Sequence, residues 1–367
     1  MKLVSNFFGA FGDAAILFPI LVLLSSKAHV SMAPLLISTG FIYVFSALYY
    51  RVPMPVQPLK SVAMAAVAIG ASFAEIRWAG AGIGFFCILL LFKGKKIDSI
   101  LSKVPLILIH QLQVGLGVLL ILQSVQSASK ASLPPLEIAL CFVFVSALLW
   151  RSEWRGVPLL GLSATIAFFI GLVNGTEGEV LGASVGVSQS DVRWGMVIGL
   201  ILPQIFLTMG NSVLSTKIIC DRLFPNQSSK LTFRQLLGVI GLGNLVVAAF
   251  GGMPFCHGSG GLTAHYRSGA RHWSSTAFFG LLLIVLSFLI SNTGVVIPAF
   301  LLVVLLATVG CFHVTLANQS WKEAGGRWYL FATVAVVLLT KNLLWVFLVF
   351  GIIHLLRHKE FHFDFIR

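Results

Sequence analysis

A proline-rich stretch, PMPVQPLKS, extends from Pro53 to Ser61 inside one of the apolar parts of the chain. Its three prolines fall within six residues, and each lacks an N–H donor and clashes with the preceding turn, so a regular helix is excluded there. Pro58 fits the first turn of a helix that we expect to end near Ser72. The start of such a half-helix presents unpaired N–H groups and a partial positive charge, which are features that bind an anion.

Three polar side chains accompany this helix start. Gln57 offers a neutral hydrogen-bond donor, and Ser61 offers a hydroxyl. Lys60 is the only basic residue that we place inside an apolar segment rather than between segments. Ionisable residues in such positions are usually functional or paired with another group. We therefore predict that Gln57, Lys60 and Ser61 contribute to an anion-binding site.

A second stretch, GGMPFCHGSGGLTAHYR, extends over residues 251–267 and again places a Met-Pro pair before a helix start made of small residues. Gly258 and Gly260 allow a ligand to approach the backbone closely, and Ser259 offers a hydroxyl. His257 is able to donate to an anion or to change its charge near neutral pH. Two half-helix starts that face each other would form an anion site built largely from backbone dipoles.

A third stretch, LPQIFLTMGNSVLST, extends over residues 202–216. Gln204, Thr208 and Asn211 are spaced by four and three positions, so they share one face of a helix. A polar face on an apolar helix turns toward protein or a cavity rather than toward lipid. Hydrogen bonds between helices and contact with a substrate both account for such a face, and the sequence leaves the two open.

Composition places these stretches in a membrane. Hydrophobic residues make up 57% of the 367 residues, charged residues only 10%, and the mean hydropathy is +0.96. A soluble domain carries about 25% charged residues, because its surface faces water. The longer apolar segments reach the roughly 20 residues that cross a lipid bilayer. A net charge of +13 would indicate nucleic-acid binding in a soluble protein, but here the basic residues lie between apolar segments, so no nucleic-acid partner is expected.

Charged and Pro/Gly-rich points divide the chain into about fourteen apolar segments. With the N-terminus in the cytoplasm, nineteen basic residues fall on the cytoplasmic side and five on the opposite side, the asymmetry expected of a multi-pass membrane protein. We therefore predict an all-α polytopic membrane protein with both termini in the cytoplasm. The segments lie near residues 10–26, 34–51, 58–72, 80–92, 105–126, 136–150, 157–174, 194–214, 235–251, 257–269, 276–291, 295–316, 329–340 and 342–357.

The two halves of the chain echo each other. Met54-Pro55 opens the third segment, and Met253-Pro254 opens the tenth, 199 positions later. With seven segments per half, the second half enters the membrane from the opposite side, which is the inverted-topology repeat common in secondary transporters. Two Gly-x-x-x-Gly pairs, at positions 80 and 84 and at positions 195 and 199, further predict close packing between helices.

No metal site or catalytic group is expected. The five cysteines are scattered, mostly within apolar segments, without metal-ligand spacing. The chain has no H-E-x-x-H motif, no paired aspartates within membrane segments and no Ser-His-Asp arrangement. The stretch HGSGG is similar to an oxyanion hole, but no nucleophile elbow accompanies it. An enzyme is therefore the weakest of the alternatives.

The motifs as a set resemble the molybdate transporter family that is related to the SulP sulfate permeases. The resemblance rests on PMPVQPLKS, on LPQIFLTMGNSVLST and on GNLVVAAFGGMPFCHGSGGLTAHYRSGAR. GAFGDAAILFPILVLL, over residues 9–24, and PLILIHQLQVGLGVLL, over residues 105–120, are similar to the first-helix and fifth-helix stretches of that family. The resemblance covers most of the chain, and CHGxGG and PQ…GN are its most specific motifs.

This resemblance implies a SulP/UraA-like fold, the seven-plus-seven inverted repeat of sulfate, bicarbonate and uracil permeases, with half-helices at segments three and ten. A core domain would carry the substrate and slide against a gate domain, as an elevator does. Related permeases imply a homodimer, and the cell membrane, plasma or inner, is the implied location. The implied core is residues 1–92 and 194–291, the implied gate is residues 105–174 and 295–357, and residues 358–367 form a short cytoplasmic tail.

The implied function is secondary active transport of a tetrahedral oxyanion, molybdate, by alternating access and without a cofactor. Ser259 stands where the family pattern has alanine, so sulfate and tungstate stay open as substrates, and an anion channel is the alternative from another class. Asp13 and His257 are the candidates for coupling to a proton or a sodium ion, and a structural role for either stays open. The implied substrate-binding residues are Gln57, Lys60, Ser61, Gln204, Thr208, Asn211, His257, Gly258, Ser259 and Gly260.

Overall fold

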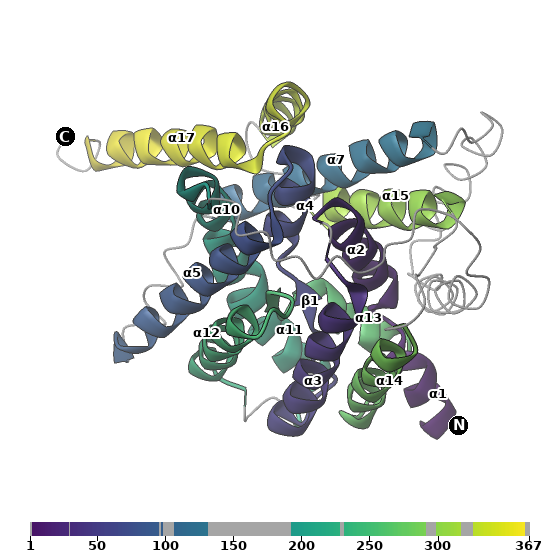
Figure 1. Cartoon of the computed structure of the whole chain (residues 1–367). Helices are drawn as coiled ribbons and strands as arrows, with labels where there is room; N and C mark the ends of the chain where they lie inside the picture. The colour runs from purple at the N-terminus through teal and green to yellow at the C-terminus, as the bar shows by residue number, and fades with distance from the viewer. Residues whose placement is uncertain are drawn as a thin grey trace.

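The computed structural model describes residues 2–28, 30–94, 97, 106–130, 192–227, 231–290, 299–316 and 326–363, which are mostly helical (Figure 1). Five helices among them are long and apolar enough to cross a membrane: Val4–Ser25, Met32–Tyr50, Phe73–Leu91, Ile107–Ser129 and Trp194–Leu223. The predicted all-α membrane architecture is therefore confirmed. The predicted segments 136–150 and 157–174 lie outside the described residues, so the count of fourteen stays a prediction.

The first half of the chain departs from the predicted segments at three points. A turn at residues 11–13, at the start of the predicted first segment, separates it from a further helix over Lys2–Ala10 that the prediction did not include. The fourth helix begins at Phe73 rather than near residue 80, because Ser72 and Glu75 form a capping box in which each side chain accepts from the other's backbone N–H. The third ends at Ile69, and Gly70 follows in the left-handed conformation (φ 66°) that commonly ends a helix. The elements are α1 (Lys2–Ala10), α2 (Ala14–Lys27), α3 (Met32–Tyr50), β1 (Gln57–Pro58), α4 (Lys60–Ile69), α5 (Phe73–Leu91) and α7 (Leu106–Lys130).

The second half contains one helix with an unusual winding. α10 (Trp194–Leu207), η2 (Thr208–Ser215) and α11 (Thr216–Leu223) follow one another without interruption, and η2 is a π-helix. Turns of π-helix are rare and are frequently found at functional sites. The other described elements are α12 (Phe233–Ala249), β2 (Phe255–Cys256), α13 (Ser259–Arg267), α14 (Ser274–Ile290), α15 (Ala299–Leu316), α16 (Gly326–Thr340) and α17 (Leu343–Phe363).

Two short extended strands pair in the middle of the structure, where Figure 1 shows β1. β1 and β2 are antiparallel, with Gln57 opposite Cys256 and Pro58 opposite Phe255. The backbone N–H of the next residue, Leu59, donates to the carbonyl of Pro254 at 3.0 Å. α4 begins two residues after β1, and α13 begins three residues after β2. Both predicted half-helices therefore start from one strand pair.

Three helix pairs place the two halves of the chain against each other: α3 packs on α14, α5 on α12, and α7 on α15. Each pair meets at two facing glycines. A Cβ atom on Gly40 would lie only 2.6 Å from the carbonyl oxygen of Gly280, which leaves no room for a side chain. The facing glycines are Gly40 with Gly280, Gly84 with Gly241, and Gly117 with Gly310.

These helix pairs have the symmetry of an inverted repeat. If the two halves are exchanged, α3 takes the place of α12 and α14 takes the place of α5, so one pair turns into the other. The glycines follow the same rule, since Gly241 lies 201 positions after Gly40 and Gly280 lies 196 positions after Gly84. The same exchange leaves the β1–β2 pair and the α7–α15 pair unchanged, because each of them joins an element to its own counterpart in the other half. The contacts thus support the repeat that the two Met-Pro pairs predict.

The predicted Gly-x-x-x-Gly contact is confirmed for the pair at positions 80 and 84. Gly80 lies against the ring of Pro254, and Gly84 lies against α12. By contrast, no described atom lies within 4 Å of the place where a Cβ atom of Gly195 would stand. A Cβ atom on Gly199 would be in ordinary contact with the side chain of Leu344 on α17, at 3.5 Å. Close packing at positions 195 and 199 therefore stays a prediction.

We expect Gly40→Ala to lower the melting temperature of the purified protein in detergent, followed by tryptophan fluorescence. The new methyl group would overlap the carbonyl of Gly280, and overpacking of this kind costs roughly 1–3 kcal/mol. Gly195→Ala is the matched control, which should melt at or slightly above the wild-type temperature because alanine is favoured over glycine within a helix. Equal melting temperatures for the two variants would contradict the close crossing of α3 and α14.

Candidate functional site

A small polar cavity lies beside the start of α4. Residues of α4, α10, η2 and β2 form one side, and residues of α7 and α15 form the other. The first group of elements belongs to the predicted core, and the second belongs to the predicted gate. The cavity is lined by Lys60, Gln113, Leu116, Gln204, Leu207, Asn211, Ser212, Cys256 and His313.

Lys60 is the first residue of α4 and is buried at this cavity, with 5% of its surface exposed. Its Nζ atom lies 3.4 Å from Nε2 of His313, which stands on α15 and is also buried. A buried ammonium group needs a partner that accepts hydrogen bonds, and a neutral imidazole is able to provide one. The cation of the predicted core therefore meets a side chain of the predicted gate.

Two carboxamides on the α10–η2 helix reach the two half-helix starts. Gln204 Oε1 accepts from the backbone N–H of Ser61 at 3.0 Å, and its Nε2 donates to the hydroxyl of Thr208 at 3.1 Å. Asn211 Oδ1 accepts from the hydroxyl of Ser259 at 2.5 Å. The polar face expected from the spacing of four and three is buried, and it connects to α4 at one end and to α13 at the other.

Gln57 fills the space beside the start of α13 rather than the cavity. Its Nε2 donates to Oδ1 of Asp13, and its side chain lies so close to Gly258 and Gly261 that a Cβ atom at either glycine would overlap it. Asp13 stands in the break between α1 and α2 and also accepts from the hydroxyl of Tyr43 at 3.1 Å. Asp13 and Gln57 therefore form a buried polar chain behind the strand pair.

His257 also lies away from the cavity. Its Nδ1 is 2.8 Å from the carbonyl oxygen of Pro55, and its ring meets that of Tyr50 edge to face. The carbonyl of His257 accepts from the hydroxyl of Thr216 at 2.8 Å. The next residue, Gly258, is the extended N-cap of α13. These contacts place His257 among α3, α11 and the stretch just before β1, where it fixes the approach of the chain to the second half-helix.

The structure thus divides the predicted site residues into two groups. The first group lines the cavity or is hydrogen-bonded to residues that do, and consists of Lys60, Ser61, Gln204, Thr208, Asn211 and Ser259. The second group lies behind the strand pair or forms the start of α13, and consists of Asp13, Gln57, His257, Gly258 and Gly260. Among the described residues, no group of three or more His, Cys, Asp or Glu side chains is placed to hold a metal ion.

Comparison with known proteins identifies the family. A model of the family described as "Molybdate transporter of MFS superfamily" matches residues 5–120 and 196–312, which together make up more than half of the chain. The chain belongs to this molybdate transporter family. The resemblance predicted from the motifs is therefore confirmed.

Named relatives support the same assignment. Molybdate transporter 2 of Arabidopsis thaliana is 27% identical over 389 residues, which cover 91% of this chain and 83% of the relative. Molybdate transporter 1 of the same plant is 27% identical and covers 78% of this chain and 72% of the relative. Molybdate transporter 1 of Chlamydomonas reinhardtii is 23% identical and covers 90% and 87% of the two chains.

A solved structure has the same fold. The transmembrane domain of a cyanobacterium bicarbonate transporter, BicA, matches with a TM-score of 0.63 over 94% of this chain and 97% of that one. The two sequences are 17% identical, so the likeness concerns the fold alone. The predicted SulP/UraA-like fold is confirmed. Together with the family and the apolar helices, it makes this molybdate transporter family member a multi-pass membrane transporter.

Besides two leucines, sequence reasoning missed four residues that line the cavity, and each of the four carries a polar or thiol side chain. Gln113 on α7 and His313 on α15 reach it from the predicted gate, and Ser212 and Cys256 reach it from the predicted core. A polar residue inside an apolar helix by itself indicates contact with a cavity or with another polar group. Gln113 and His313, however, stand outside the Met-Pro stretches and the polar helix face, so nothing in the local pattern connects them with Lys60.

Asn244 on α12 holds the second strand in place, and sequence reasoning missed it as well. Its Oδ1 accepts from the backbone N–H of Phe255 at 2.9 Å. Its Nδ2 donates to the carbonyl of Phe255 at 2.7 Å and to that of Ile240 at 2.8 Å. The side chain therefore pairs with β2 as the backbone of a third strand would.

We expect Asn244→Leu to lower the melting temperature and to reduce substrate uptake. A leucine of similar size leaves the N–H and the carbonyl of Phe255 without these partners, and a buried unsatisfied group costs about 1–3 kcal/mol. Thermal unfolding in detergent and uptake into proteoliposomes measure the two effects. Asn342→Leu removes the hydrogen bond that the side chain of Asn342 accepts from the backbone N–H of Leu344 at the start of α17, and is the control, with a smaller loss of stability. Wild-type melting of Asn244→Leu would show that β2 does not depend on this side chain.

Proposed function

We propose that this chain is a secondary active transporter of molybdate that works by alternating access. The observation that carries the proposal is the polar cavity with one buried cation, Lys60, at the start of a half-helix. The family and the relatives named as molybdate transporters support the choice of substrate. In this proposal the substrate binds at the cavity, between the starts of α4 and α13, and the cavity, whose volume of about 10 Å³ has room for about one water molecule, widens when the substrate enters.

The chemistry of the cavity favours an anion. The described residues that line it include one lysine and no carboxylate. Gln113, Gln204, Asn211 and Ser212 all carry groups that donate hydrogen bonds. The positive end of α4 adds to the charge of Lys60. A tetrahedral oxyanion offers only acceptors, so each of these groups has a use when such a substrate is bound.

The side-chain oxygens of Gln204 and Asn211 accept hydrogen bonds from two donors that a substrate would use. These donors are the N–H of Ser61 and the hydroxyl of Ser259. We propose that oxygens of molybdate replace the two carboxamide oxygens, and that the carboxamides then turn their NH₂ groups toward the substrate. Each buried donor is satisfied before and after binding, so the exchange avoids the cost of an unpaired polar group.

Alternating access requires the core, residues 1–92 and 194–291, to move against the gate, residues 105–174 and 295–357. The contact between Lys60 and His313 crosses this boundary and must break when the core moves. A bound molybdate gives Lys60 a new partner and so releases it from His313. In this proposal the contact holds the empty core against the gate until substrate arrives.

Accumulating a dianion needs a driving ion. Moving two negative charges into a cell against an inside-negative potential costs about 4.6 kcal/mol per 100 mV, so a proton or a sodium ion must accompany the substrate. We propose Asp13 as the group that binds it, because Asp13 is buried and bonded to Gln57 beside the start of α13. His257, on the carbonyl of Pro55, is the second candidate.

The same hydrogen-bond donors would also bind sulfate or tungstate, which are the alternative substrates. Molybdate and sulfate differ in size and hydration more than in charge, so selectivity rests on the fit of the cavity. An anion channel would use the same dipoles but would show conductance that does not saturate. We place the protein in the cell membrane as a homodimer with both termini in the cytoplasm, the orientation that the nineteen-to-five distribution of basic residues supports.

Purified protein in detergent should bind molybdate saturably in the presence of a large excess of sulfate, as measured by isothermal titration calorimetry. Lys60→Met should abolish binding, because it removes the cation of the cavity and keeps an apolar side chain of similar length. Lys93→Met, at the exposed end of α5, is the control and should bind as the wild type does. If sulfate binds more tightly than molybdate, sulfate is the substrate of the same site. If neither oxyanion binds, the proposed function is contradicted.

His313→Ala should bind molybdate roughly tenfold more tightly, because Lys60 no longer has to leave a partner and a hydrogen bond to a charged group contributes about 1.5–3 kcal/mol. The same titration measures this change. Thr308→Ala is the control on the same helix, since its hydroxyl donates to the carbonyl of Val304 within α15, and its affinity should not change. Weaker binding by His313→Ala would show that His313 is a ligand of the substrate rather than a competitor for Lys60.

A further inference from the structure

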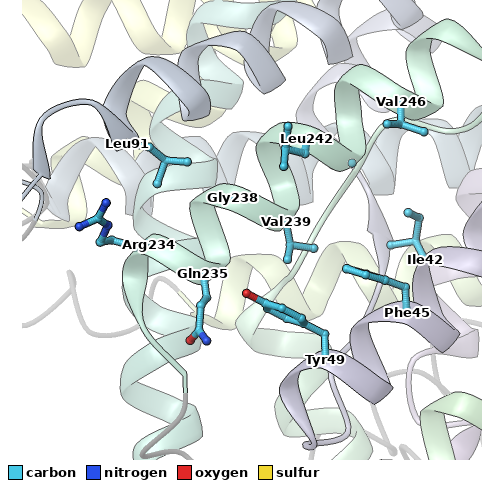
Figure 2. Close-up of a pocket in the computed structure, with 11 residues that line it drawn as sticks. Ile42, Phe45, Tyr49, Leu91, Arg234, Gln235, Gly238, Val239, Leu242 and Val246 are labelled. Carbon is cyan, nitrogen blue, oxygen red and sulfur yellow. The ribbon is translucent and has the colours of Figure 1, made fainter.

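An apolar groove runs along the surface of the proposed core, apart from the polar cavity (Figure 2). It is formed by α3, by α12 and by the end of α5, and its volume is about 560 Å³. Pockets that bind small molecules have volumes of about 300–1,000 Å³. Phe45 and Leu242 border it with about half of their surface exposed, 49% and 60%. In a membrane transporter, such a surface faces the acyl chains of the bilayer.

The groove has the length of one leaflet. It follows α12 from Arg234 to Val246, and Figure 2 shows these two residues at its opposite ends. Twelve helical steps of 1.5 Å give about 18 Å. The hydrocarbon core of a bilayer is about 30 Å thick, so one leaflet measures about 15 Å. The groove therefore begins at one face of the membrane and ends near its middle.

The end at the membrane face is basic. Arg234 is exposed in the first turn of α12 and lines the groove beside Gln235. The carbonyl of Gln235 accepts from the hydroxyl of Tyr50 at 3.3 Å, which joins the end of α3 to the start of α12. Lys93 is exposed two residues beyond Leu91, where α5 reaches the groove. No acidic residue is among the described residues that line the groove.

We propose that this groove binds one anionic phospholipid of the cytoplasmic leaflet, with an acyl chain along α12 and its phosphate at Arg234. Basic residues at the cytoplasmic surface attract the negatively charged headgroups of anionic lipids. A lipid matches both parts of the groove, because its chain covers the apolar walls and its phosphate neutralises the guanidinium. An apolar helix from a second copy would cover the walls and leave Arg234 without a counter-charge.

The lipid would act on the helix that positions the substrate site. α12 presents Arg234, Gly238 and Leu242 to the groove, while Asn244 on the same helix bonds to β2. Filling the groove restrains α12 and so stabilises the strand pair. This inference rests on the membrane location and on the groove, and it does not depend on molybdate being the substrate.

Native mass spectrometry of the delipidated protein in detergent tests the proposal with two probes, phosphatidylglycerol, which is anionic, and phosphatidylcholine, which is zwitterionic. We expect several-fold more phosphatidylglycerol to stay bound. Arg234→Gln should lower phosphatidylglycerol binding to the level of phosphatidylcholine. Arg222→Gln, at the end of α11 and outside the groove lining, is the control and should leave the preference unchanged.

A second variant blocks the groove without removing charge. A Cβ atom on Gly238 would meet only the side chain of Leu91, at 3.9 Å, so Gly238→Leu fills the groove without displacing backbone. It should lower the binding of both lipids, whereas Gly195→Leu, at an open position of α10, should not. Equal binding of the two lipids by the wild type would overturn the proposal. A second outcome would also overturn it: if Gly238→Leu separates a dimer into monomers and leaves lipid binding unchanged, the groove is an interface between copies.

Discussion

Backbone N–H and carbonyl groups cannot stay unpaired at membrane depth, and most of this structure depends on how the chain meets that constraint. The prolines of the Pro53–Ser61 stretch break the third membrane segment, and the second Met-Pro stretch breaks the tenth in the same way. Each extended piece then needs partners. β1 and β2 become partners of each other, and the remaining N–H and carbonyl of Phe255 pair with Asn244.

The same constraint creates the site. A helix that starts at the middle of a membrane leaves its first N–H groups without helical partners, and side chains must satisfy them. Gln204 does this for Ser61 at the start of α4, and Asn211 accepts from Ser259 at the start of α13. A side chain that can rotate away is a replaceable partner, unlike a backbone carbonyl. The need to satisfy helix starts thus leaves donors that a substrate is able to take over.

How much the sequence predicts depends on how local the determining contact is. The membrane segments that fall within the described residues, the two half-helix starts and the polar face of α10–η2 follow from composition and spacing, and the structure contains them. The predicted start of α5 is too late because the segments were divided at charged residues, and Glu75 is one of them. In the structure Glu75 caps the helix and pairs with Arg193, whose Nε lies 2.7 Å from the carboxylate of Glu75. The partner of Lys60 is His313, 253 positions away, and no local pattern connects the two. The direction of Gln57 is likewise set by packing, since its side chain fills the space that Gly258 leaves open.

The glycine contacts also bear on which parts of the molecule move together. Backbone meets backbone where α3 crosses α14 and where α5 crosses α12, and all four helices lie in the proposed core. The third crossing, of α7 with α15, lies within the proposed gate. None of these three crossings joins one proposed domain to the other. At the cavity, the two domains meet instead through long side chains such as Lys60 and His313, which rearrange by rotation about single bonds. These three backbone contacts thus lie inside the proposed domains, whereas the contacts at the cavity between the domains are made by side chains, as a sliding core requires.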